Sequence, residues 1–392
     1  MRDLPENEAA TIDRAVARAI DRALAGHELT REEGLSLVRT RGPELAALVG
    51  AADRLRRQSK GEVITYVVNR NINFTNVCVV GCKFCAFGKG PRDPQAYWLT
   101  LEQVADKAEE ARRRGATEIC MQGGLPAGLD PMHYRDLVRA IKRRVPEIHL
   151  HAFSPMEIDY GVELTGMTVA DYLTMLKDEG LGTIPGTAAE ILDDRVRQVV
   201  SQNKLSRARW IEIVTTAHRV GLRSTSTMMY GHVEEPEDWV DHLLLLRELQ
   251  KETGGFTEFV PLGFIHTQTR LYQMGGARPG PTDEEHLRVH ALARLLLRGQ
   301  IDNIQVSWVK LSRPQAQACL QAGANDYGGT LMEESISRMA GATSGEFMPP
   351  EEFQARIREL GRLPAERTTG YRILPHPRLP TEVCDGMVSP SR

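Results

Sequence analysis

Short β-prone runs alternate with amphipathic helical segments from about residue 60 onward, and this alternation constrains the fold more than any other feature. Eight such runs occur, at residues 71–76, 118–122, 148–153, 181–185, 223–230, 256–262, 303–309 and 323–327. Strands that alternate with helices form parallel sheets. Eight repeats over roughly 270 residues match the usual size of a (β/α)8 barrel. The sequence therefore predicts an α/β fold of the TIM-barrel type, with a doubly wound open sheet as the alternative.

The predicted helices carry start and stop signals. The Thr-x-x-Gln and Thr-x-x-Glu patterns at residues 100–103 and 282–285 are capping boxes, which begin helices. Gly115 and Gly299 follow these helices and directly precede the next strands, as expected of C-terminal caps. A third helix is expected between Thr168 and Gly180.

Three regions are expected along the chain. Residues 1–60 read as a helical extension, in which residues 12–24 place apolar side chains on one face and Thr30 opens another capping box. Residues 61–345 form the predicted barrel. Residues 346–392 are expected to hold a C-terminal helix and a loose tail. No Pro/Gly/Ser-rich linker separates these regions.

The composition favours a folded enzyme with small substrates. The chain has 392 residues, of which 41% are hydrophobic and 26% charged, which excludes a disordered or collagen-like chain. The chain has 49 Lys and Arg residues and 52 Asp and Glu residues, so it carries no excess of basic residues. The charge therefore gives no indication of a nucleic-acid partner or of binding to an anionic membrane. The sequence contains neither a membrane-length apolar run nor an apolar signal region, so we expect a cytoplasmic protein.

Three of the six cysteines, Cys78, Cys82 and Cys85, fall within eight residues. In a reducing compartment such spacing favours a metal site over disulfides. The loop follows the first predicted strand, so it lies on the face of a barrel that carries active sites. Three thiolates can hold three irons of a 4Fe-4S cubane, with Gly81 permitting a tight turn. Zinc is disfavoured because no second Cys or His pair follows, and Cys120 is expected to be a small buried residue rather than a fourth ligand.

A CxxxCxxC loop with an aromatic residue before its third cysteine resembles the radical S-adenosylmethionine (SAM) superfamily. The resemblance implies a 4Fe-4S cluster whose open iron is chelated by SAM, and Phe84 packing near the adenine rather than only in the core. It also implies that Gly123 and Gly124, at the end of the second strand, offer backbone groups to the methionyl amine. Glu190 is expected to accept a ribose hydroxyl or an amino group, although a carboxylate at a helix N-terminus is the alternative interpretation.

Longer segments, including MQGG, IPGTAAEILDDRVR, STSTMMYGH, SWVKL and GANDYGGTLMEESIS, narrow this resemblance to the family of FO synthase second subunits. It implies that the 4-hydroxybenzyl group of L-tyrosine is joined to 5-amino-6-(D-ribitylamino)uracil during deazaflavin coenzyme biosynthesis. It also implies an electron donor and a first FO synthase subunit as partners. Aminofutalosine synthase of menaquinone biosynthesis is the alternative. The chain departs from many relatives by lacking a His after Gly124 and before Gly345.

Polar residues near the predicted strand ends are candidates for substrate contact, because barrel active sites use such positions. We select Tyr230, Glu258 and Asp326 as candidate catalytic residues. Other polar residues near these ends are Glu157, His232, His266 and Asn325. Any one of them could instead satisfy a loop backbone. A non-catalytic iron-sulfur or zinc protein is the third function class, which a full barrel with a glycine pair at strand two disfavours.

Overall fold

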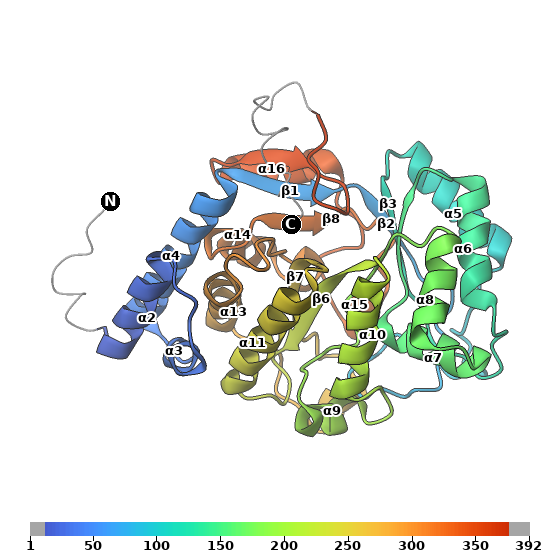
Figure 1. The fold of residues 1–392 in the computed structure, drawn as a ribbon, viewed down its shortest axis with the longest axis horizontal. Coiled ribbons are helices and arrows are strands. Elements are labelled where there is room, and N and C mark those ends of the chain that lie inside the picture. The colour runs from blue at the N-terminus through green and yellow to red at the C-terminus, as the bar shows by residue number, and fades with distance from the viewer. Residues whose placement is uncertain (1–11, 376–392) are drawn as a thin grey trace.

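The computed structural model describes residues 12–375, and parallel strands form its centre (Figure 1). The strands are β1 (Val63–Val67), β2 (Asn69–Ile72), β3 (Glu118–Met121), β4 (His149–Ala152), β5 (Thr183–Ile184), β6 (Arg223–Tyr230), β7 (Phe256–Gly263), β8 (Asp326–Gly329) and β9 (Leu363–Glu366). β2 to β7 pair in sequence order, each parallel to the next. β1 continues into β2 through Val68, so the two act as one strand of the sheet.

The sheet closes into a ring through a short segment at residues 304–305. Ile304 pairs with Phe259 of β7, Gln305 pairs with Asp326 of β8, and β8 in turn pairs with β1. The predicted (β/α)8 barrel is therefore confirmed, and the open sheet is wrong. The strand expected at 303–309 is reduced to these two bridges, because the chain turns into the 3-10 helix η1 (Trp308–Lys310).

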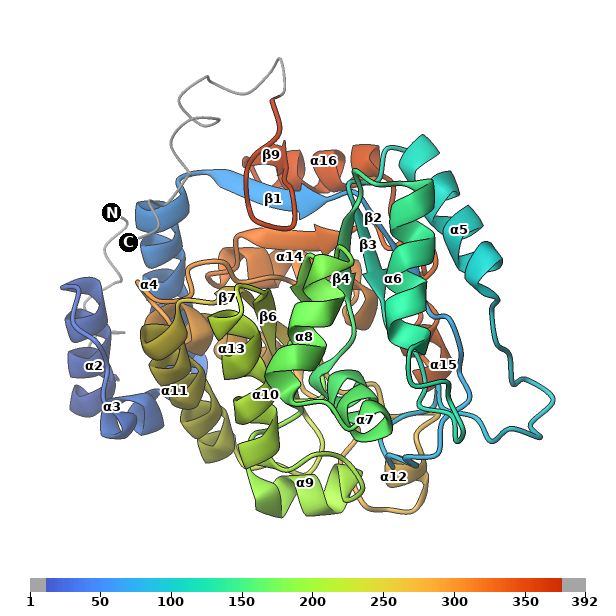
Figure 2. The same ribbon diagram turned by 45° about the vertical axis from the view of Figure 1, so that its right-hand side comes forward.

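Helices surround the ring (Figures 1 and 2). They are α2 (Arg14–Leu24), α3 (Arg31–Leu37), α4 (Gly42–Lys60), α5 (Leu101–Arg113), α6 (His133–Arg144), α7 (Pro155–Thr165), α8 (Val169–Asp178), α9 (Asp194–Ser201), α10 (Arg207–Arg219), α11 (Pro236–Thr253), α12 (Arg270–Gln273), α13 (Asp283–Leu296), α14 (Arg313–Gln321), α15 (Ile336–Ala340) and α16 (Pro350–Glu359). The capping boxes predicted at Thr100 and Thr282 are both present. Gly115 and Gly299 take φ values of 89° and 73°, the left-handed conformation that ends a helix.

The N-terminal helices α2, α3 and α4 form a layer against α11 and α13 on one side of the barrel (Figure 1). Three barrel arginines donate to backbone carbonyls of this layer: Arg247 to Leu29 at 2.9 Å, Arg288 to Thr40 at 2.6 Å and Arg298 to Ala23 at 2.5 Å. Helix carbonyls at a C-terminus lack partners within the helix. Ala23 lies in the last turn of α2, whereas Leu29 and Thr40 lie in the segments that flank α3. The arginines thus tie a helix end and two connecting segments of the layer to the barrel.

The C-terminal segment completes the ring at the N-terminal ends of the strands. β9 pairs with β1 along Val63–Tyr66, whereas β3 pairs with β2 and not with β1. β9 therefore fills the side of the first strand that β3 does not reach. The sequence predicted a helix and a tail here, and α16 is that helix, whereas β9 was not anticipated. The predicted tail beyond residue 375 lies outside the described residues.

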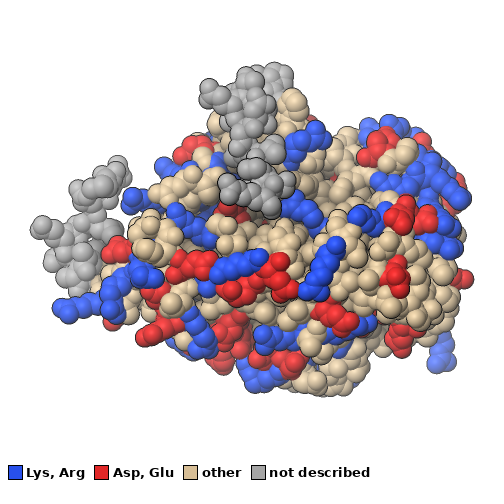
Figure 3. Space-filling view, in the orientation of Figure 1, with Lys and Arg blue, Asp and Glu red and all other residues tan. Residues whose placement is uncertain are grey.

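Positive and negative side chains are interspersed over the face seen in Figure 3. Within residues 12–375, no helix combines the length and apolar character needed to cross a membrane.

Candidate active site

A cavity of about 310 Å³ lies at the C-terminal ends of the strands. Its wall combines the loop after β2, the end of β3, the first turn of α7, the segment after β5, the ends of β6 and β7, η1 and the segment after β8. Cys78, Cys82 and Cys85 all line it, together with Phe84, Gly123, Gly124 and Glu190. The structure therefore brings the predicted cluster and cofactor residues to one place. A second, more polar cavity of about 520 Å³ lies beside it and shares Ile265 and Lys310.

The cysteine loop is fixed by backbone hydrogen bonds to a later part of the same loop, to the segment after β3 and to α9. Cys78 N donates to Lys89 O at 3.0 Å, Val79 N to Leu125 O at 2.9 Å, and Lys83 N to Val200 O at 3.0 Å. Gly81 reverses the chain with a φ of 69°, which a residue with a side chain rarely adopts. The loop is consequently held in shape while its thiols face the cavity.

These thiols fit a cubane better than a single ion. Within residues 12–375, no three Cys, His or carboxylate side chains converge closely enough to hold one metal ion. In a cubane the three thiolates need not meet at one metal ion, because each thiolate binds a different iron. The three cysteines form no disulfide and are half-buried. Burial raises the pKa of Cys82 to about 12, and coordination by a metal would remove its proton.

The glycine pair is required by packing of the protein on itself. A β-carbon on Gly123 would lie 2.4 Å from the Phe74 ring, and one on Gly124 would lie 2.2 Å from Val77 O. Their backbone N–H groups donate to Glu157 Oε1 at 2.9 Å and to Thr75 O at 2.8 Å. Both N–H groups are thus occupied, so the expected contact with the methionyl amine is left to the carbonyl groups.

Glu157 links the ends of β3 and β4. It is the N3 residue of the capping box of α7, so its carboxylate accepts from Ser154 N at 2.7 Å as well as from Gly123 N. Burial raises the pKa of Glu157 to about 7, against the opposing effect of these donors. The sequence feature that indicates this position is the Ser-x-x-Glu capping box at residues 154–157, which begins α7.

Glu190 lies in a strained turn and is already paired. Ala188 and Glu190 take φ values of 60° and 42°, and such strain in non-glycine residues clusters at functional sites. Lys204 Nζ lies 2.6 Å from Glu190 Oε1 and 5.1 Å from the centre of the Phe84 ring. Lys204 thus connects the cofactor candidates Phe84 and Glu190, a link that the sequence analysis missed.

Sequence reasoning also missed Lys310 and Glu334, although the SWVKL and GGTLMEESIS segments contain them. Both side chains line the cavity. Lys310 Nζ donates to Ser337 Oγ at 3.0 Å, and the Glu334 carboxylate accepts from Ser337 N at 3.0 Å. Burial lowers the pKa of Lys310, while the nearby Glu334 and Cys85 act to raise it.

Tyr230 does not reach the cavity. Its side chain is fully buried, and its hydroxyl forms a 2.6 Å hydrogen bond with Nδ1 of His286 on α13. The residue ends β6 but faces outward, toward the helices. Its neighbours Thr227 and Met229 line the cavity instead. The geometry therefore gives no support to the predicted catalytic role.

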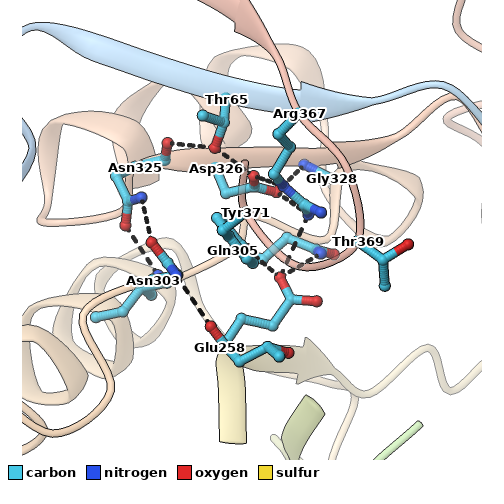
Figure 4. Close-up of polar contacts among 12 residues, drawn as sticks. Thr65, Glu258, Asn303, Gln305, Asn325, Asp326, Gly328, Arg367, Thr369 and Tyr371 are labelled. Carbon is cyan, nitrogen blue, oxygen red and sulfur yellow. Dashed lines mark hydrogen bonds and ion pairs between the residues drawn. The ribbon is translucent and has the colours of Figure 1, made fainter. Parts of the chain in front are cut away.

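Glu258 and Asp326 do not line the cavity but lie at the other end of the barrel. Figure 4 shows them within one group of polar contacts. Glu258 is the third residue of β7 and Asp326 the first of β8, so both are near the N-terminal ends of their strands. Arg367 ties them together, with its guanidinium 2.5 Å from Asp326 and 3.5 Å from Glu258. Tyr371 also donates to Glu258. Their expected place at the cavity was wrong. Glu258 lies near the start of a strand whose bounds were predicted almost correctly, and Asp326 begins β8, whereas the strand expected at 323–327 would have ended just after it.

Comparison with known proteins agrees with this site. Residues 72–246 match the Radical SAM superfamily, and residues 253–379 match the CofH/MqnC C-terminal region. The chain is 52% identical to the 5-amino-6-(D-ribitylamino)uracil--L-tyrosine 4-hydroxyphenyl transferase of Methanothermobacter thermautotrophicus, over 88% of this chain and 94% of that one. This chain belongs to the radical SAM superfamily. Within it, the chain belongs to the family of that transferase. Radical SAM proteins bind a 4Fe-4S cluster and SAM, in agreement with the expected cofactors.

Longer radical SAM relatives contain a similar segment. The FO synthase of Nocardia farcinica is 55% identical over 95% of this chain, and that of Mycobacterium tuberculosis 54% identical over 92%. The match covers only 43% and 42% of those proteins. This chain therefore spans less than half of the FO synthases that it resembles.

Solved structures support the barrel of this radical SAM protein. Methylornithine synthase superimposes with a TM-score of 0.70 at 17% identity, over 88% of this chain and 97% of that one. The hydrogenase maturase HydG of Carboxydothermus hydrogenoformans gives a TM-score of 0.72 at 17% identity, over 91% and 80%. At such low identity the similarity concerns the fold alone.

Proposed function

We propose that this protein cleaves L-tyrosine and joins its 4-hydroxybenzyl group to 5-amino-6-(D-ribitylamino)uracil. The observation that carries the proposal is the 52% identity with the transferase of that name, which extends over 94% of the relative. The position of the cavity supports it, since the active sites of barrel enzymes lie at the C-terminal ends of the strands. The cysteine loop, the glycine pair and the strained Glu190 turn all meet there.

We propose that Cys78, Cys82 and Cys85 hold the cluster and leave one iron open for SAM. When bound, the two cofactors supply a 5′-deoxyadenosyl radical. Phe84 and the Gly123–Gly124 pair line the same cavity and contact SAM in this proposal. Glu190, which retains acceptor capacity beside Lys204, receives a hydroxyl or amino group of the cofactor.

The remaining wall of the cavity keeps water from the reacting groups. Met156, Met229, Leu262, Phe264 and Ile265 line it with apolar side chains. Such a wall orients substrates while the cofactors perform the difficult chemistry. It also suits the aromatic ring of tyrosine, which has a large apolar surface.

The proposal includes partners. An electron donor must reduce the cluster, and the donor is expected to be a separate molecule. Because the similar segment accounts for only 43% of the Nocardia FO synthase, we further propose that a first FO synthase subunit acts together with this chain. A reducing compartment, the cytoplasm in this proposal, would keep the loop thiols available for iron.

The test is anaerobic incubation of the reconstituted enzyme with reductant, SAM, ring-labelled tyrosine and the ribityl-uracil. We expect 5′-deoxyadenosine and an adduct that contains both the labelled ring and the uracil, identified by mass analysis. Omitting the uracil, or replacing tyrosine with phenylalanine, should leave only slow cleavage of SAM. An equally abundant adduct from phenylalanine would exclude the phenol as a requirement. Turnover of an enolpyruvyl-benzoate precursor instead of tyrosine would indicate the menaquinone branch.

A further inference from the structure

Some of the charged side chains that line the cavity have close partners in the protein, and one, Lys310, has no oppositely charged group in direct contact among the described residues. Lys204 forms an ion pair with Glu190, and Glu157 is surrounded by three donors from Gly123 and Ser154. Lys310 is different. Within the described part of the chain, its ammonium group donates only to Ser337 Oγ and forms no ion pair, although the Glu334 carboxylate lies near enough to act on its charge. The cavity therefore holds a cation whose charge the protein leaves without a direct partner.

Two acceptors lie on neighbouring parts of the same wall. The Glu334 carboxylate is buried and accepts from Ser337 N, but a carboxylate has about four acceptor positions and this contact does not exhaust them. Asn71, on β2, also lines the cavity, and its buried Oδ1 accepts no hydrogen bond. A buried acceptor without a donor is costly unless a ligand supplies one. β2 runs beside the segment that follows β8, since Asn71 N donates to Leu331 O at 2.7 Å.

We propose that Lys310 binds the α-carboxylate of the amino-acid substrate and that Glu334, with Asn71, binds its α-ammonium group. This assignment rests on the proposed function, which makes that substrate tyrosine. Lys310 and Glu334 both contact Ser337, so they lie close together with opposite charges. That arrangement complements the zwitterionic end of an amino acid. The aromatic ring would then extend along the apolar wall.

SAM also carries an amino-acid group. The order of the strands around the barrel separates the expected SAM site from the proposed substrate site. The glycine pair follows β3, Glu157 lies on α7 and Glu190 lies in the segment after β5. Lys310 and Glu334 belong to the segments that follow residues 304–305 and β8, on the opposite side of the ring. The side of β3 to β5 is therefore left for SAM, and the side of Lys310 for the substrate.

The experiment measures ligand binding without turnover. Reconstituted, SAM-loaded enzyme is titrated anaerobically, with no reductant, with tyrosine, with tyramine, which lacks the carboxylate, and with 3-(4-hydroxyphenyl)propionate, which lacks the ammonium group. We expect the wild type to bind tyrosine at least tenfold more tightly than either analogue, since a charge-assisted hydrogen bond is lost with each. In Lys310→Met the preference over tyramine should disappear. In Glu334→Gln, which keeps an acceptor for Ser337 N, the preference over the propionate should disappear.

Matched controls separate this effect from misfolding and from the SAM site. Lys310→Arg should retain most of the preference for tyrosine over tyramine, and Lys251→Met, at an exposed ion pair with Glu28, should retain all of it. Unchanged tyrosine affinity in Lys310→Met, or weakened binding of SAM alone with an unchanged tyrosine preference, would overturn the assignment. If the wild type forms the labelled adduct, either of these two results rejects only the assignment of Lys310 and Glu334 to the substrate and leaves the proposed function standing. A wild type that neither binds tyrosine nor forms the adduct would reject the proposed function itself.

Discussion

Cys78, Cys82 and Cys85 differ from the other described cysteines in what surrounds each thiol. The three line the cavity, whereas Cys120 lies within β3 and Cys319 is buried on α14. Because a cubane held by two thiolates is labile, changing any one of the three to Ala should abolish the visible absorbance of the cluster and cleavage of SAM. Cys120→Ala and Cys319→Ala should retain both. Absorbance and iron content provide the measurement, and loss of iron in Cys120→Ala would show that the ligand set is wrong.

Arg367 pairs with two buried carboxyl groups, Glu258 and Asp326, near the N-terminal ends of β7 and β8. Removing one partner of such a network leaves uncompensated buried charge, which costs about 3–5 kcal/mol. Arg367→Met should therefore lower the free energy of unfolding by that amount. Arg372→Met is the matched control, because Arg372 is exposed and should change stability by less than about 0.5 kcal/mol. Chemical denaturation of the two variants decides whether the network has this structural role.

Glu258 gives a prediction about pH. Burial raises the pKa of its carboxyl from 4.5 to about 7, although Arg367 opposes the shift. Between these two pH values the folded state binds more protons than the unfolded state, so the free energy of unfolding decreases as the pH rises. Glu258→Gln should make this decrease shallower, while Glu157, with a similarly raised pKa, preserves part of it. Denaturant midpoints across this window are the measurement. Adduct formation per folded Glu258→Gln molecule should stay near wild type, and its loss would restore the catalytic interpretation.

At the scale of elements, the loop after β2 and the end of β3 depend on each other. A β-carbon on Gly124 would lie 2.2 Å from the carbonyl of Val77, the residue before the first loop cysteine. Because a backbone atom cannot move aside cheaply, Gly124→Ala should displace the loop and lower cluster retention as well as SAM binding. Gly90→Ala is the control, since nothing lies within 4 Å of its β-carbon position. Full iron content in Gly124→Ala, measured after reconstitution, would contradict this coupling.

Local signals predicted the elements better than long-range ones. The capping boxes at Thr100 and Thr282 were found because they involve residues three apart. β9 was missed because it is held extended by pairing with β1, 300 residues earlier in the sequence. The cysteine loop could be predicted because all its ligands are close in sequence. Glu258 was misplaced although the expected strand matches β7, because the third residue of a strand lies near its N-terminal end and barrel active sites lie at the C-terminal ends. Asp326 was misplaced because its strand was expected at 323–327 and begins only at Asp326.

At the scale of the whole molecule, helix α13 is buried between the barrel strands and the N-terminal helices. Every residue of α13 from Arg288 to Leu296 is buried, and α4 packs along it. A helix buried on all sides needs neighbours on all sides. The N-terminal layer is thus part of the core that supports the barrel, although the sequence marks residues 1–60 as an extension.

This packing predicts that the layer and the cluster site unfold together. Leu48 on α4 is fully buried, so Leu48→Ala should lower the free energy of unfolding by about 2–5 kcal/mol. Arg54, on the same helix but exposed, provides the control, and Arg54→Ala should change it by less than about 0.5 kcal/mol. In Leu48→Ala, far-UV circular dichroism and cluster absorbance should be lost at the same, lower denaturant concentration, because one cooperative transition moves both signals. If the absorbance midpoint stays at its wild-type value while part of the helical signal is lost earlier, the layer folds as a separate unit.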